Sequence, residues 1–132
     1  MNEPLEGIKV LDITQSVAGP YCTMLLGDFG AEVIKIERPD GGDDTRSWGP
    51  LFWGKESTTF LAVNRNKRSV ALDLKHGEGQ KILWDLVSQA DVLVQNLRSI
   101  TLDRMGFGYD AVKAENPGVI YCSLEREELV RL

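Results

Sequence analysis

The sequence predicts an α/β fold with a mainly parallel sheet covered by helices on both faces. Short segments rich in β-branched residues alternate along the chain with segments whose apolar residues recur at helical spacing. The strand-like segments are almost continuously apolar, as is typical of strands buried on both faces of a parallel sheet. Both observations indicate a Rossmann-like arrangement, and 132 residues suffice for one such domain.

The first half of the chain begins with a predicted strand at residues 8–13. Pro20 favours the first turn of a helix, and Gly30 is a suitable residue to end it. The apolar positions of this helix are Cys22, Leu25, Leu26 and Phe29. Residues 32–37 form the second predicted strand. The polar, glycine-rich segment 38–57 is predicted to be a long loop, and loops of that length inside a domain are usually functional.

The second half continues the alternation of strands and helices. Residues 58–63 fit either a short helix or a short strand. The remaining predicted elements are a strand at 69–74, a helix at 79–90, a strand at 91–95, a helical stretch around 102–105, a helix at 109–115 and a strand at 119–123. Ligands of parallel sheets bind beyond the carboxyl ends of the strands, so that edge is where a site is expected.

Composition and charge exclude several classes of protein. The net charge of −5, from 15 basic and 20 acidic side chains, argues against nucleic-acid binding. No apolar run approaches the ~18 residues of a membrane span, and the start of the chain does not resemble a signal peptide. Cys22 and Cys122 are expected to be free thiols. We therefore expect an intracellular protein, cytoplasmic or mitochondrial, with no targeting sequence visible in this chain.

Cations follow several predicted strands of this acidic chain. Arg38 follows the second strand, Lys75 the third, and Asn96 with Arg104 the fourth, while residues 64–68 add three cations before the third strand. Small residues after the first strand lead into a helix whose first N–H groups could donate hydrogen bonds to an anion. Phosphate recognition would explain this placement. Alternatively, Arg38 pairs with Glu37 or Asp40, and Lys75 with Asp73.

Other catalytic patterns are absent or ambiguous. The sequence contains no G-x-G-x-x-G fingerprint, no phosphate-binding G-x-x-x-x-G-K-[ST] motif and no zinc-ligand spacing, and His76 is its only histidine. Asp43 and Asp44 could hold a divalent cation, but turn chemistry explains them better, so no metal site is predicted. The aromatic residues Trp48, Phe52 and Trp53 either close over a ligand or anchor the long loop.

Several ordered blocks of the sequence resemble one known family. The opening PLEGIKVLD at residues 4–12 is followed by similar blocks at 18–20, 26–39, 42–46, 64–69, 72–75, 91–96 and 102–106. Together they resemble the N-terminal part of the class III CoA-transferases, the family of formyl-CoA transferase, carnitine CoA-transferase and α-methylacyl-CoA racemase. Residues 42–52 look most like the members that use succinate or glutarate.

The resemblance implies a coenzyme A site on this chain, with acyl-CoA as a substrate and no covalently bound cofactor. In the family, the segment matching Val17 and Ala18 lines the CoA cleft, and the arginine matching Arg38 contacts phosphates. The segment from Leu72 to Lys75 holds the adenine end. The residues implied to bind the pantetheine and phosphate parts are Asn96, Leu97, Arg104 and Met105.

The resemblance also implies a mechanism and its partners, an acyl-CoA and a carboxylic acid. A family aspartate attacks the thioester to form a mixed anhydride, the CoA thiolate then gives an enzyme thioester, and the incoming acid completes the exchange. That aspartate follows the segment matching residue 124, so no catalytic residue is expected in this chain. Family members form interlocked homodimers, which this chain is not expected to do.

The expected organisation is therefore a family domain at residues 1–124 and a tail at 125–132 that resembles nothing in the family. The chain is expected to be a truncated form, inactive on its own. Two alternatives remain at this point. One is a CoA-binding or regulatory module, or a truncation product without function. The other is the nucleotide-binding domain of a reductase, against which the missing glycine fingerprint counts.

Overall fold

A five-stranded parallel sheet forms the centre of the protein. The computed structural model describes residues 2–124, and the predicted tail at 125–132 lies outside this range. The strand order is β5-β2-β1-β6-β7, and every neighbouring pair is parallel. The five strands are β1 Lys9–Ile13, β2 Glu32–Glu37, β5 Lys67–Ala71, β6 Val92–Gln95 and β7 Ile120–Ser123. This sheet confirms the predicted α/β class.

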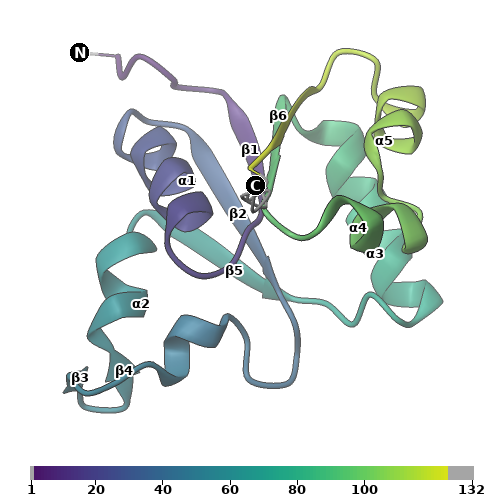
Figure 1. Ribbon diagram of the computed structural model, residues 1–132. Helices are drawn as coiled ribbons and strands as arrows, with labels where there is room; N and C mark the ends of the chain where they lie inside the picture. Colours follow the sequence, from purple (N-terminus) through teal and green to yellow (C-terminus); the bar gives the residue numbers. More distant parts are fainter. Residues whose placement is uncertain (1, 125–132) are drawn as a thin grey trace, which may run out of the picture.

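Helices cover both faces of the sheet, as predicted (Figure 1). On one face lies α1, Ala18–Asp28, with the short α2, Thr58–Val63, beside it; on the other lie α3 (Gly77–Gln89), α4 (Ser99–Arg104) and α5 (Tyr109–Glu115). None of the helices in residues 2–124 is long and apolar enough to cross a membrane. Residues 58–63, which fitted either element, are helical.

The segment predicted as one long loop contains regular structure. A 3₁₀ helix, η1 Asp44–Ser47, is capped by Asp43, whose side chain accepts a hydrogen bond from the Thr45 N–H. An antiparallel pair follows, β3 Phe52–Trp53 with β4 Glu56–Ser57, and leads into α2. Asp43 therefore has the turn-forming role that its glycine-rich setting indicated.

The third strand lies two to three residues earlier than predicted. Apolar residues suggested 69–74, but β5 spans Lys67–Ala71, because its register with β2 ends at the pair Glu37 and Ala71. The Leu72 N–H still reaches Glu37 O (2.9 Å), after which Asp73 turns the chain by accepting the Lys75 N–H. Leu72 therefore directly follows the sheet, whereas Lys75 lies in a turn.

The first helix agrees with its predicted ends, while several apolar side chains are exposed. Helix α1 begins at Ala18 with Pro20 in its first turn, and Gly30, with φ of 99°, follows its last turn, both as predicted. Leu25 and Phe29, two of its apolar positions, are exposed. At the far edge of the sheet β7 pairs with β6 alone among the strands of residues 2–124, and Ile120 is 65% exposed.

Candidate functional site

The turn between β1 and α1 is the centre of the carboxyl edge. The Asn96 side chain, directly after β6, accepts the Gln15 N–H (2.8 Å) and donates to Gln15 O (2.7 Å). This pair of bonds fixes the start of α1 to the end of β6. Gly19 permits the close approach, because a Cβ at that position would lie 2.5 Å from Cβ of Thr14 and 3.0 Å from Nδ2 of Asn96.

The open end of α1 faces the same edge. Val17, which precedes the helix, provides no side-chain cap, and Pro20 has no N–H. The first hydrogen bond along the helix runs from the Tyr21 N–H to Val17 O (2.8 Å). The N–H groups of Ala18 and Gly19 therefore lie at the positive end of the helix dipole, beside exposed Val17. This arrangement suits a polar or anionic ligand.

Arg38 lies where the sequence predicted, at the carboxyl end of β2. Its guanidinium pairs with Asp44, and both side chains are about half exposed. The alternative partners considered from the sequence, Glu37 and Asp40, are not the ones it uses, because Glu37 points into the protein and pairs with Arg46 (2.7 Å). Arg38 is thus accessible to a phosphate that can compete with Asp44.

The other residues implied by the resemblance are distributed around this edge. Leu72 is buried in the core, and Lys75 is exposed in the turn before α3. Asp73 pairs with His76 rather than with the Lys75 ammonium; Nε2 of His76 lies 3.3 Å from Oδ2 of Asp73. Beyond β6, Leu97 and Met105 pack against the apolar core, while Arg104 is exposed.

Arg98 was missed by the sequence analysis. It is exposed and lies between Leu97 and α4, three residues beyond the end of β6. Its position after a strand was the same signal that identified Arg38, but it falls outside the blocks that carried the resemblance. It adds a second cation to the part of the carboxyl edge that follows β6.

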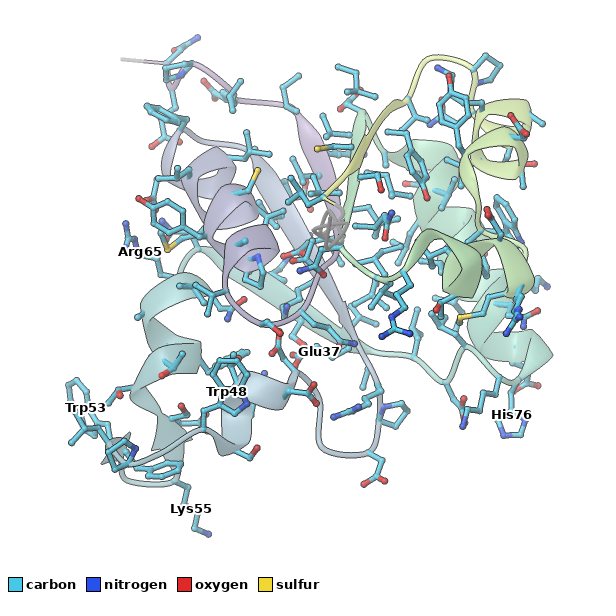
Figure 2. The ribbon with its side chains drawn as sticks, viewed as in Figure 1. Glu37, Trp48, Trp53, Lys55, Arg65 and His76 are labelled. Atoms are coloured by element: carbon cyan, nitrogen blue, oxygen red, sulfur yellow. The ribbon has the colours of Figure 1, made fainter. Side chains whose placement is uncertain are left out.

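One predicted cation cluster lies at the wrong edge. Residues 64–66 precede β5, and Lys67 and Arg68 are its first two residues, so the cluster lies at the amino end of that strand. Arg65 pairs with Asp28 (2.6 Å), Arg68 pairs with Glu32, and Figure 2 shows Arg65 at the periphery beside α1. Only Lys67 extends toward the site, because its long side chain leans along the sheet to Asp12.

A network of buried charges lies under the carboxyl-edge site, between the sheet and α1. Nζ of Lys67 lies 3.0 Å from Oδ2 of Asp12, and both side chains are almost fully buried. Asp12 also accepts hydrogen bonds from the hydroxyl groups of Thr14 and Thr23. These contacts occupy the Asp12 carboxylate. Its role is structural: it fixes the turn after β1 and the first part of α1.

Glu37, on β2, and Arg46, in η1, form the second part of this network, and Figure 2 shows Glu37 between the sheet and the segment that carries Trp48. The Arg46 guanidinium lies 3.7 Å from the ring centre of Phe60 in α2. Burial alone would raise the pKa of Glu37, but hydrogen bonds from Arg46, Ser69 and the Asp43 N–H lower that pKa to about 2. Glu37 is therefore ionised and occupied at neutral pH.

Burial and ion pairing also act on Asp43 and Lys67. Burial would raise the pKa of Asp43, but hydrogen bonds from Lys35 and from Thr45 lower it. For Lys67, burial lowers the pKa even though Asp12 opposes that shift. Asp43 faces Lys35, and Asp44 faces Arg38. Both carboxylates are therefore used in ion pairs.

The long segment also carries exposed aromatic residues. Trp53 is 81% exposed at the β3–β4 turn, where it projects outward with Lys55, and Phe52 and Trp48 are about half exposed (Figure 2). Of the two roles considered from the sequence, anchoring the segment is therefore excluded for Trp53.

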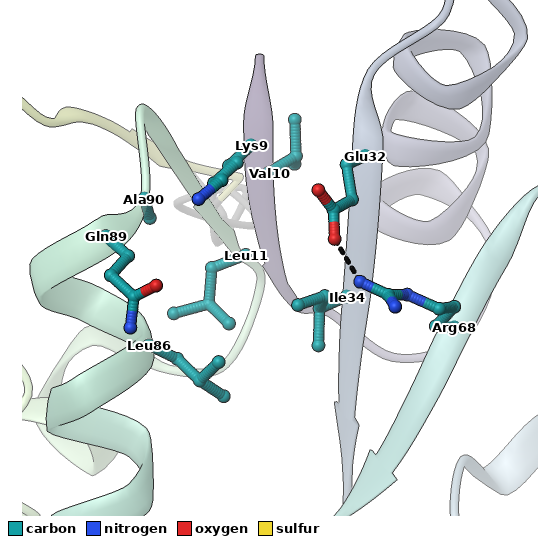
Figure 3. Close-up of a pocket in the computed structure, with 9 residues that line it drawn as sticks. All are labelled: Lys9, Val10, Leu11, Glu32, Ile34, Arg68, Leu86, Gln89 and Ala90. Atoms are coloured by element: carbon teal, nitrogen blue, oxygen red, sulfur yellow. Dashed lines mark hydrogen bonds and ion pairs between the residues drawn. The ribbon is translucent and has the colours of Figure 1, made fainter. Parts of the chain in front are cut away.

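A cavity of about 210 Å³ lies at the opposite, amino edge of the sheet (Figure 3). It opens between the end of α3 and the starts of β1, β2 and β5, over an apolar floor that includes Leu11 and Ile34. The charged side chains at its rim are Lys9, Glu32 and Arg68, and the last two pair with one another. It is separate from the carboxyl-edge site.

Comparison with known proteins identifies the family of this chain. The sequence model of CoA-transferase family III matches residues 5–126. The chain belongs to CoA-transferase family III. The match includes every candidate site residue, and it confirms the resemblance drawn from the sequence blocks.

Relatives within this family show how much of the protein is represented. Succinyl-CoA:glutarate CoA-transferase of Homo sapiens is 53% identical over 122 residues, covering 92% of this chain and 28% of that protein. Formyl-CoA:oxalate CoA-transferase of Bradyrhizobium sp. (strain ORS 278) is 44% identical over 125 residues, covering 95% of this chain and 29% of that protein. The solved structure of a CAIB/BAIF family protein from Brucella suis superposes with a TM-score of 0.87 at 42% identity. The match covers 93% of this chain and 33% of that one. The chain thus spans less than a third of the curated relatives' length.

Proposed function

We propose that this chain is the CoA-binding part of a family III CoA-transferase that moves CoA between an acyl-CoA and a carboxylic acid. One observation carries the proposal: family membership coincides with an open carboxyl edge at which the β1–α1 turn, Arg38 and Asn96 come from three different strands. Binding at that edge is what the fold favours. The candidate contacts are Val17, Ala18, Arg38, Leu72, Lys75, Asn96, Leu97, Arg104 and Met105.

A dicarboxylic acid is the proposed acceptor. The relatives include transferases named for succinate and glutarate from Homo sapiens and Agrobacterium fabrum, at 53% and 42% identity. The similarity between residues 42 and 52 that the sequence analysis singled out supports the same class.

The transfer chemistry itself is assigned to a carboxylate outside the described residues. A nucleophile must be held about 3–3.5 Å from the thioester carbon and be free to attack. Asp12, Glu37 and Asp43 are buried in ion pairs, and Asp44 pairs with Arg38. We therefore propose that residues 2–124 bind CoA and supply no nucleophile.

Calorimetry with CoA, dephosphorylated pantetheine and NAD tests the binding proposal. Wild-type protein should bind CoA more tightly than either of the other two. Arg38→Ala should weaken CoA binding about tenfold or more, because a charge-assisted contact contributes roughly 1.5–3 kcal/mol, and should leave pantetheine binding unchanged. Asp44→Asn should strengthen CoA binding by releasing Arg38, and Arg65→Ala, at the far edge, is the matched control. Equal loss for both ligands, or preference for NAD, contradicts the proposal.

A chemical trap tests the assignment of the nucleophile. The chain is incubated with succinyl-CoA and hydroxylamine, and its carboxylates are examined by mass spectrometry. We expect no hydroxamate on residues 2–124. Stoichiometric trapping at one carboxylate there would show that the nucleophile lies within the described residues.

A further inference from the structure

A buried ion pair lies directly against the β1–α1 turn. Nζ of Lys35, on β2, lies 2.9 Å from Oδ2 of Asp43, and their side chains are 1% and 0% exposed. The same ammonium donates a hydrogen bond to Thr14 O (2.8 Å), and Oδ1 of Asp43 accepts the Ser16 N–H (3.3 Å). The pair therefore contacts the backbone of the turn at two points.

The turn has a backbone conformation that requires such support. Ser16 has φ of 68°, in the left-handed region that residues other than glycine rarely adopt. Unfavourable conformations of this kind persist where the surrounding contacts over-determine them. Here the contacts come from Asn96 at Gln15 and from Lys35 and Asp43 on either side. The next two residues are Val17 and Ala18, which belong to the proposed CoA site.

The same pair connects the turn to the segment after β2. Oδ1 of Asp43 also accepts the Thr45 N–H (2.9 Å), and the Asp43 N–H donates to Oε1 of Glu37 (2.8 Å), which Arg46 also contacts. Residues 37–46 and the turn are thus joined through one carboxylate. A buried ion pair is by itself weak evidence for stability, because apolar replacements of similar volume are often as stable, so its contacts must indicate its role.

We propose that Lys35 and Asp43 are positioning residues for the CoA site, which hold the β1–α1 turn in its binding conformation and link it to the segment that begins with Arg38. The inference rests on the proposed function. It assigns to both residues an effect on ligand binding through the backbone of residues 14–18, without contact to the ligand. The turn and residues 38–46 should consequently respond together when CoA binds.

The test uses the full chain and the double variant Lys35→Met/Asp43→Asn, which removes both charges at nearly constant volume. Val87→Ala, in the core of α3 on the opposite face of the sheet, is the control that lowers stability away from the turn. For each protein we measure the Kd for CoA by calorimetry, the urea midpoint, and the backbone amide signals of Ser16 and Gly19 by nuclear magnetic resonance.

We expect the double variant to bind CoA about tenfold more weakly or worse, a change of about 1.4 kcal/mol in binding free energy, and to shift the Ser16 and Gly19 amide signals. Val87→Ala should lower the urea midpoint while its Kd stays within about twofold of wild type, as independent sites do. A folded double variant with wild-type Kd and unshifted amides overturns the proposal, as does a control that loses affinity equally.

Two further outcomes are separated by the same measurements. If the double variant does not fold, Lys35→Gln/Asp43→Asn is used, because it also removes both charges but retains a donor for Thr14 O and an acceptor for the Ser16 N–H. It should shift the same amides with a smaller loss of affinity, and unchanged amides and affinity overturn the proposal. If wild-type protein does not bind CoA, the proposed function fails, and the amide signals of the folded variants still decide whether the pair positions the turn.

Discussion

The two faces of the sheet differ in the kind of side chain that they bury. The face under α3, α4 and α5 is apolar, with Leu11, Ile13 and Ile36 from the strands packed against Leu83 and Phe107. The face under α1 is apolar only toward the amino ends of the strands, where Val10, Val33 and Val94 cluster. Toward the carboxyl ends it carries the buried charges Asp12, Lys35, Glu37 and Lys67.

The comparison teaches that burial serves different purposes on the two faces. The apolar face stabilises by removing surface from water, an effect that tolerates exchange of side chains with similar volume. On the charged face each side chain is held by an ion pair and by specific hydrogen bonds, and loss of the oppositely charged partner leaves a charge buried without compensation. The charged face is also the one against the β1–α1 turn, so the rigid, directional contacts occur where the site needs fixed geometry.

The largest effect should come from breaking one ion pair on the charged face. Lys67→Met leaves the Asp12 carboxylate buried and unpaired, and should lower the free energy of unfolding by about 3–5 kcal/mol. Urea unfolding followed by circular dichroism measures this. Arg65→Met, which removes the exposed pair with Asp28, should leave the midpoint close to that of wild type. Equal losses in the two variants would mean that burial does not distinguish these pairs.

Acid should weaken the charged face selectively. The pKa of Glu37 is about 2 in the folded protein, against an ordinary value of 4.5. Because the folded value is the lower one, its contribution is fully present above pH 4.5 and is lost as the pH falls from 4.5 toward 2. The loss should approach about 3 kcal/mol of unfolding free energy. Denaturation of wild type and Glu37→Gln at several pH values measures it, and parallel curves would contradict this account.

The smallest effect should come from a volume-conserving change on the apolar face. Leu83→Met should cost less than about 1.5 kcal/mol of unfolding free energy, and the cost should not vary between pH 6 and 3. Leu83→Ala, which leaves a cavity, should cost about 2–5 kcal/mol and provides the control in the same urea series. A cost for Leu83→Met as large as that for Lys67→Met would remove the distinction between the faces.

The sequence predicted most of the fold because local patterns carry that information. Strands β1, β2, β6 and β7 and helix α5 lie within a residue of their predicted positions. The boundaries of β5 were wrong, because the strand ends where its pairing with β2 ends, and not where its apolar residues end. The segment 38–57 was predicted only as a loop, because its 3₁₀ helix and short strands depend on Asp43 and Arg46 meeting partners elsewhere in the chain.

The sequence by itself determined the order of the elements, the parallel sheet and the family, because these follow from hydrophobic periodicity and from ordered blocks of residues. Only the tertiary structure decided which charges meet. In the sequence, Asp12, Lys35 and Glu37 stand among the apolar residues of β1 and β2, which indicates that they are buried. The sequence does not indicate which residues they pair with. Lys67 lies 55 residues from Asp12, and Asn96 lies 81 from Gln15. Electrostatic and hydrogen-bonding energies depend on distances of a few ångströms, which only strand register and side-chain direction fix.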